Sequence, residues 1–170
     1  MTKMLLKFCF PLLVFPFCVS SQQAEVDSLF QVAINTTPPE QVEAYVKLSA
    51  HTRNSNADTS LFFAKKAYEL AEQSGDDYLV SIASIGLGSV LHVRGSYDLS
   101  AKYYSRALEL ATKEKNDSLR ASAHTGLGAT RWQLGRHAES LEHHFRSLRI
   151  REQLNDVRGM VIARNSIGMV

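Results

Sequence analysis

Residues 76–110 read DDYLVSIASIGLGSVLHVRGSYDLSAKYYSRALEL, and residues 116–150 repeat the pattern forty positions later as NDSLRASAHTGLGATRWQLGRHAESLEHHFRSLRI. The shift aligns Gly88 with Gly128, and residues 156–168 begin the pattern once more. A period near forty residues indicates one supersecondary unit stacked on copies of itself. Because such a unit buries its apolar face only against its neighbours, we expect packing between repeats to stabilise the fold and an extended groove to carry the function.

The register of the repeat predicts an all-α fold in which each unit is a pair of helices. Apolar residues at helical spacing in residues 22–35 add a capping helix before the first unit. The predicted segments are a capping helix at 22–36, repeat 1 at 37–75, repeat 2 at 76–115, repeat 3 at 116–155 and the first helix of a truncated repeat 4 at 156–170.

Short signals mark where the helices begin and end. Thr37, followed by two prolines and Glu40, predicts a capping box with proline at the first helical position. Gly75 and Asn155 are predicted to end helices in the left-handed conformation. The polar residues that follow these junctions are predicted to cap the next helices: Asp76, Asn116 and Asp156.

Small residues inside the predicted helices imply close packing. Gly88 and Gly128 lie in mid-helix, where glycine costs about 1 kcal/mol relative to alanine, so a close approach between helices is the expected compensation. Ser60, Ser100 and Ser140 recur every forty residues in the second helices. We expect them to let each second helix lie close to its neighbour.

Residues 1–21 form a basic and then apolar leader. Two lysines precede an apolar run from Phe8 to Val19, and no acidic residue occurs. This pattern predicts a signal peptide cleaved near Gln22 and an exported, periplasmic or otherwise extracytoplasmic protein. The run is shorter than the roughly 20 residues of a spanning helix and contains two prolines, which disfavours an uncleaved anchor. A lipoprotein signal is disfavoured because the residues before Cys18 lack its leucine and small residues.

The composition excludes several classes of site. Both cysteines, Cys9 and Cys18, lie in the leader, so the mature chain would hold no disulfide and no cysteine metal site. Loss of two leader lysines reduces 19 basic residues to 17, against 17 acidic residues, so the basic pI belongs to the leader. No nucleic-acid partner is therefore expected. Residues 117–170 are mildly basic, which either a solvated face or a partner explains.

The richest cluster of catalytic residue types is His137, His143 and His144 with Glu139. Glu139 and His143 are one helical turn apart, a spacing that can hold a metal. However, His143 and His144 align with tyrosines of the preceding repeat, so substituted repeat positions are the simpler explanation. We predict no catalytic residues, no metal and no cofactor.

The unit resembles the tetratricopeptide repeat in a longer form of about forty residues, over roughly residues 38–170. The resemblance rests on Leu87, Gly88, Gly95, Tyr97, Tyr104, Ala107 and Leu108 and on their counterparts forty residues later. The sequence departs from the family at Ser100, Ser140, His144 and Ser147. The resemblance implies antiparallel helix pairs in a right-handed superhelix, with the first helices lining a concave face.

This resemblance also implies the binding site and its partner class. The residues placed on or near the groove are Ile82, Ile85, Ser89, His92, Ser122, Thr125, Ala129, Trp132, Ile162, Asn165 and Met169. Trp132 is the residue best suited to anchor a partner, with packing between helices as the open alternative. The lysine and asparagine set by which some relatives hold a terminal carboxylate is missing, so binding of chaperone tails is not expected.

The sequence thus predicts an exported, non-catalytic module that binds a protein or peptide in its groove. The alternative is the N-terminal periplasmic sensor region of a membrane signalling enzyme, a histidine kinase or diguanylate cyclase, with its catalytic part beyond residue 170. The leader followed by repeats of this style resembles such proteins, and membrane contact is expected only through the leader or a downstream segment. Exposure of Val161, Ile162 and Ile167 on the truncated fourth unit also allows self-association.

Overall fold

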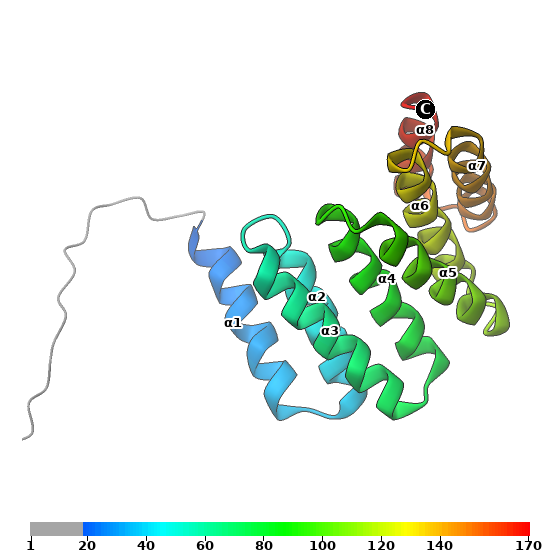
Figure 1. Cartoon of the computed structure of the whole chain (residues 1–170). Helices are drawn as coiled ribbons and strands as arrows, with labels where there is room; N and C mark the ends of the chain where they lie inside the picture. The colour runs from blue at the N-terminus through cyan, green and yellow to red at the C-terminus, as the bar shows by residue number, and fades with distance from the viewer. Residues whose placement is uncertain (1–18) are drawn as a thin grey trace, which may run out of the picture.

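The computed structural model describes residues 19–170, with side chains from Ala24 onward, and these residues form eight α-helices without a strand (Figure 1). The helices are α1 (Val19–Asn35), α2 (Pro38–Thr52), α3 (Ala57–Ser74), α4 (Asp77–Val93), α5 (Tyr97–Lys113), α6 (Asp117–Gln133), α7 (His137–Gln153) and α8 (Val157–Gly168). The predicted signal peptide and both cysteines lie outside the described residues, apart from the last three leader residues. α1 begins at Val19, three residues before the predicted start of the capping helix.

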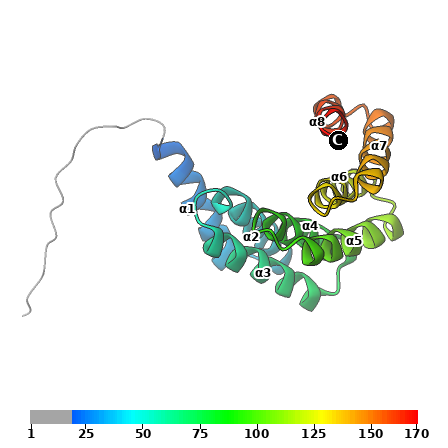
Figure 2. The same ribbon diagram turned by 45° about the horizontal axis from the view of Figure 1, so that its top comes forward.

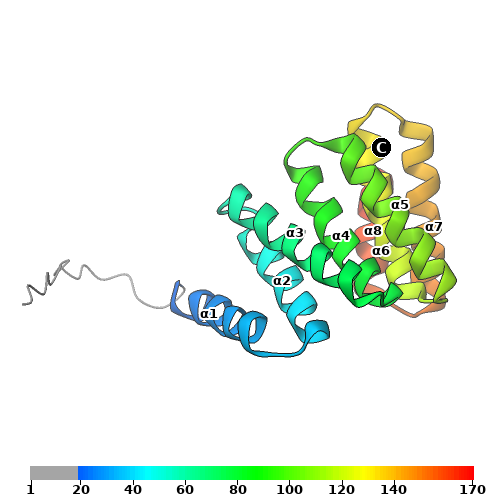
Figure 3. The ribbon, with the colours of Figure 1, turned by 60° about the horizontal axis from the view of Figure 1, so that its bottom comes forward.

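The helices form antiparallel pairs that stack into a curved solenoid, α2 with α3, α4 with α5 and α6 with α7. Figure 2 shows α6 and α8 on the inner side of the curve, with α5 and α7 outside. The first helices also contact one another directly, α2 with α4 and α4 with α6. α1 packs against α2 at one end of the stack (Figure 3). The all-α fold with helical repeats predicted from the sequence is therefore correct.

The predicted helix junctions between repeats are confirmed. The Asp76 carboxylate accepts hydrogen bonds from the backbone N–H groups of Tyr78 and Leu79, and Asn116 and Asp156 cap their helices in the same way. Gly75 and Asn155 have φ angles of 68° and 55°. Lys115 occupies the equivalent junction with φ 55°, although its side chain does not favour the left-handed region and the sequence offered no signal for it.

The predicted capping box at Thr37 is wrong, although Thr37 is the N-cap residue and proline follows it. The Thr37 side chain makes no capping hydrogen bond. Pro38 and Pro39 remove two of the backbone N–H groups that need a partner at a helix start, so less is gained from a cap. The side-chain amide of Gln41 instead donates to the Thr36 carbonyl at 2.9 Å.

The mid-helix glycines accommodate aromatic rings, which confirms the predicted close approach. A Cβ atom at Gly88 would lie 3.3 Å from the Tyr104 ring, and one at Gly128 would lie 2.5 Å from the His144 ring. The Tyr104 ring also lies against α6, where a Cβ at Gly126 would be only 2.2 Å from the ring. Tyr104 is 6% exposed and is thus wedged between the first helices of two successive repeats.

The recurring serines join the two helices of each repeat. The hydroxyls of Ser60, Ser100 and Ser140 donate to the carbonyls of Ser49, Gly88 and Gly128 at 2.7–2.8 Å. All three serines are fully buried, so each hydroxyl needs a hydrogen-bond partner within the protein. A backbone carbonyl of the neighbouring helix is that partner, because the two helices lie close together.

The core runs from one repeat to the next. One cluster joins Val42 of α2, Ala67 of α3, Leu79 and Ala83 of α4 and Leu110 of α5. Neighbouring repeats therefore bury each other's apolar faces, as stacked units require. None of the helices in the described part is long and apolar enough to cross a membrane.

Candidate functional site: the concave groove

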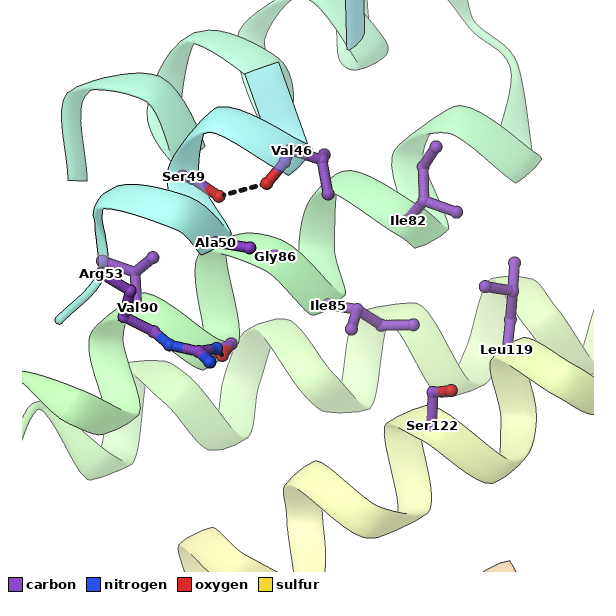
Figure 4. Close-up of a pocket in the computed structure, with 11 residues that line it drawn as sticks. Val46, Ser49, Ala50, Arg53, Ile82, Ile85, Gly86, Val90, Leu119 and Ser122 are labelled. Atoms are coloured by element: carbon purple, nitrogen blue, oxygen red, sulfur yellow. Dashed lines mark hydrogen bonds between the residues drawn. The ribbon is translucent and has the colours of Figure 1, made fainter. Parts of the chain in front are cut away.

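A cavity of about 280 Å³ lies between α2, α4 and α6, the first helices of three successive repeats (Figure 4). Val46 and Ala50 come from α2, Ile85 from α4, and Leu119 and Ser122 from α6. Gly86 adds no side chain to the cavity wall between α2 and α4, where a Cβ atom would lie 3.4 Å from the Val46 side chain. The lining is therefore mostly aliphatic and small, which suits an apolar side chain of a ligand.

Arg53 is the one charged residue that lines this cavity. It is the C-cap residue of α2, and its guanidinium donates a hydrogen bond to the Ser89 hydroxyl on α4. None of the ion pairs among the described residues includes Arg53. Arg53 thus holds a positive charge at the edge of an apolar cavity (Figure 4).

Burial raises the pKa of Tyr104, while the hydrogen bond with Ser89 and the charge of Arg53 act in the opposite direction. The buried tyrosine behind the groove therefore stays neutral. Ser89 therefore interacts both with Arg53 at the groove surface and with Tyr104, which lies between the two repeats.

A second cavity, of about 250 Å³, lies further along the groove, where His92 of α4 meets Ala129 and Trp132 of α6 and Met169 after α8. His92 Nδ1 lies 3.2 Å from the Thr130 hydroxyl. Burial, together with the Arg53 charge, lowers the pKa of His92, so this histidine is neutral near pH 7.

Trp132 combines the two roles that the sequence left open. Its ring centroid lies 4.4 Å from that of His137 at an angle of 60°, so one face is packed within the repeat. The side chain is still 36% exposed and lines the second cavity. The remaining surface is available to a ligand.

The structure brings most of the predicted groove residues into these two cavities. Ile82, Ile85, Ser89 and Ser122 line the first, and His92, Ala129, Trp132 and Met169 line the second. Thr125 instead faces its own repeat, with its hydroxyl 2.8 Å from that of Ser147. Ile162 and Asn165 are exposed on α8 and line neither cavity.

Sequence reasoning missed the contribution of α2. The first unit is one residue shorter, so a shift of 39 rather than forty aligns Leu48 with Leu87. That shift places Val46, Ala50 and Arg53 with Ile85, Ser89 and His92, which were predicted. Applying the shorter shift to α2 would have identified all three lining residues.

The histidine cluster singled out in the sequence is dispersed over α7. His137 packs on Trp132, Glu139 pairs with Arg131 and Arg136, and His144 lies against Gly128. His143 instead meets His124, with Nδ1 atoms 3.0 Å apart. Within residues 19–170, no group of three histidine, cysteine or acidic side chains is arranged to hold a metal ion.

Comparisons with known proteins agree with this architecture. Residues 79–153 match the tetratricopeptide repeat family. Comparison with curated proteins finds no match. The crystal structure of BtubC (BKLC) from P. vanneervenii is similar, with a TM-score of 0.71 and 17% sequence identity over 89% of this chain and 64% of that chain. This chain therefore spans less than two thirds of the length of that protein.

At 17% identity the likeness to BtubC shows the fold alone. The tetratricopeptide match adds a coarse functional statement, because such repeats suggest a module for protein–protein interaction and typically serve as non-catalytic scaffolds. The chain is an all-α helical repeat protein with a tetratricopeptide-like solenoid fold, and residues 79–153 match that repeat family.

Proposed function

We propose that this chain is an exported, non-catalytic module that holds a segment of a partner protein in its concave groove. The observation that carries the proposal is the aliphatic cavity built jointly by α2, α4 and α6. The proposal of export, to the periplasm or another extracytoplasmic space, rests on the leader pattern of residues 1–21.

The lining indicates what the partner segment contains. Val46, Ile82 and Ile85 favour an aliphatic side chain, and burial of such a side chain contributes about 1.5–3 kcal/mol. Arg53 favours a carboxylate beside it, because a guanidinium binds carboxylates with charge-assisted hydrogen bonds. We therefore expect a peptide segment with an aliphatic residue close to an aspartate or glutamate.

Selection from a peptide library, followed by fluorescence polarisation with the enriched peptides, tests this function. The enriched peptides should share an aliphatic residue near an acidic one. Ile85→Ala and Arg53→Gln should each weaken binding about tenfold, which corresponds to roughly 1.4 kcal/mol.

Leu99→Ala is the matched control, since Leu99 is an exposed aliphatic residue on α5 that lines neither groove cavity. This variant should bind as the unchanged chain does. Peptide binding that survives the double change Ile85→Ala with Trp132→Ala would argue against the groove as the binding surface.

A second proposal is that the module is the periplasmic sensor region of a membrane signalling enzyme, a histidine kinase or diguanylate cyclase. It is supported by the resemblance of the leader and repeats to such regions. α8 also exposes an apolar face, including Val157, Val161 and Ile162, which a following helix could cover. Self-association through α8 is the competing use of this face.

Two measurements separate these uses. Reading the coding sequence beyond Val170 should reveal a spanning segment and a kinase or cyclase domain. Light scattering of this chain and of Val161→Glu should show whether α8 joins two copies. A reading frame that closes without a spanning segment would remove the second proposal.

A further inference from the structure

A separate cavity of about 340 Å³ lies on the α6–α7 pair and shares no lining residue with the groove. α6 and α7 lie side by side near the end of the stack (Figure 2). The lining residues are Arg120 and His124 from α6, and Arg146, Arg149, Ile150 and Gln153 from α7. Four of the six thus carry guanidinium or imidazole groups.

The repeat itself shows that the fold does not need these cations. At the same positions repeat 2 has Val80, Ser84 and Glu109 in place of Arg120, His124 and Arg149. In repeat 2 the glutamate pairs with an arginine of its own helix. Although Gln153 replaces a lysine, the formal charge of the six positions rises from +1 to +3. The charge is specific to repeat 3.

The cations are only partly neutralised within the protein. Arg120 pairs with Asp117 and Arg146 with Glu142, while Arg149 makes no ion pair with a described carboxylate. The buried Nε of Arg120 has no hydrogen-bond partner among the described residues. The cavity therefore keeps positive charge that its own carboxylates do not neutralise, and an anion in the cavity would neutralise it.

The histidine in the cavity is buried and lies close to the same positive charges. His124 is buried, and its Nδ1 lies 3.0 Å from that of His143, so one ring donates and the other accepts. Burial, together with the charges of His143, Arg146 and Arg120, lowers the pKa of His124 to about 4. The cavity therefore places a neutral imidazole among guanidinium groups. A bound anion would act on the pKa of His124 in the opposite direction to these positive charges.

We propose that this α6–α7 cavity is a binding site for a phosphate group, either inorganic phosphate or the phosphate of a phosphomonoester. Guanidinium groups from two helices face one cavity, and their planar forks match the oxygens of a tetrahedral dianion. The volume leaves room for an organic group beside the phosphate.

Nuclear magnetic resonance with labelled histidine side chains, together with calorimetry, tests the site in the full chain. Inorganic phosphate and O-phosphoserine are titrated separately, with glutamate as a carboxylate reference. Saturable binding of either phosphate probe that shifts the His124 and His143 signals supports the proposal. Tighter binding of phosphoserine assigns the site to phosphomonoesters, whereas equal binding assigns it to the phosphate group alone.

Arg149→Glu restores the repeat 2 residue at an exposed position, so the variant should fold normally, and it should weaken phosphate binding at least about tenfold. Arg120→Val, also taken from repeat 2, should weaken binding similarly. Lys102→Glu makes the same charge change at an exposed position on α5 outside the cavity and should leave binding unchanged. No saturable binding, equal binding of glutamate, or an equal loss in Lys102→Glu would overturn the proposal.

Discussion

Adding one methyl group at Gly126 should destabilise the solenoid, whereas the same change at Gly86 should stabilise it. The two glycines occupy the same position in successive repeats, in the middle of α6 and α4. A Cβ at Gly126 would lie 2.2 Å from the Tyr104 ring, but one at Gly86 would lie 3.4 Å from the Val46 side chain. The reason is that repeat 1 has Ala64 where repeat 2 has Tyr104.

The expected magnitudes follow from two opposing terms. Replacing a mid-helix glycine by alanine gains about 1 kcal/mol in helix propensity at either site. Gly126→Ala also forces the buried Tyr104 ring to move, and such overpacking costs about 1–3 kcal/mol. Gly86→Ala carries little of that cost. The two variants should therefore differ in free energy of unfolding by about 1–3 kcal/mol, or roughly 2–12 °C in Tm.

Urea unfolding followed by circular dichroism measures this difference. Tyr104→Ala provides the matched background, since it removes the ring and copies the residue of repeat 1. In that background Gly126→Ala should no longer destabilise, and the double-mutant cycle isolates the contact. If Gly126→Ala proves as stable as Gly86→Ala with Tyr104 intact, Tyr104 does not act as a tightly held wedge.

Three further predictions concern stability. Ser140→Ala should lower the free energy of unfolding by about 1 kcal/mol, because it removes the buried hydrogen bond to Gly128, and an unchanged urea midpoint would count against that bond. Asp76→Ala should cost about 1 kcal/mol through loss of the α4 cap, and an unchanged midpoint would contradict this. His124, which faces His143 and Arg146 on α7 and Arg120 on α6, should make stability depend on pH. Its pKa is about 4 when folded and about 6.5 when unfolded, so this contribution is complete above pH 6.5 and falls by up to about 3 kcal/mol as the pH drops towards 4. His124→Ser should flatten that dependence between pH 7.5 and 4.5, and an equally steep dependence would refute it.

The repeat pattern predicts much of the fold because its signals are local. Caps at Asp76, Asn116 and Asp156 depend on hydrogen bonds within one turn, and the left-handed residues Gly75 and Asn155 depend on backbone sterics. Such features follow from residues only a few positions apart. The same local reasoning failed at Thr37, whose side chain makes no capping hydrogen bond although it is the N-cap residue of α2.

The groove was predictable in part, because its residues were taken from the later repeats and not from the first unit. Arg53, which is the one charged residue in the aliphatic cavity, was therefore left out of the predicted groove. Thr125 shares its repeat position with Ile85, but its hydroxyl finds a partner in Ser147 and the side chain turns inward. The direction of a polar side chain therefore depends on its hydrogen bonds as well as on its position in the repeat.

The sequence by itself determined the all-α repeat architecture, the helix junctions and the small residues where helices meet, because a forty-residue period and local capping chemistry express these features directly. Only the tertiary structure decided which side chains share the α6–α7 cavity. Arg120 and Arg146 are on different helices and are unremarkable in the sequence, yet they line one cavity. The wedge of Tyr104 against Gly126 likewise depends on how two repeats stack, since it joins residues whose contact no local pattern expresses.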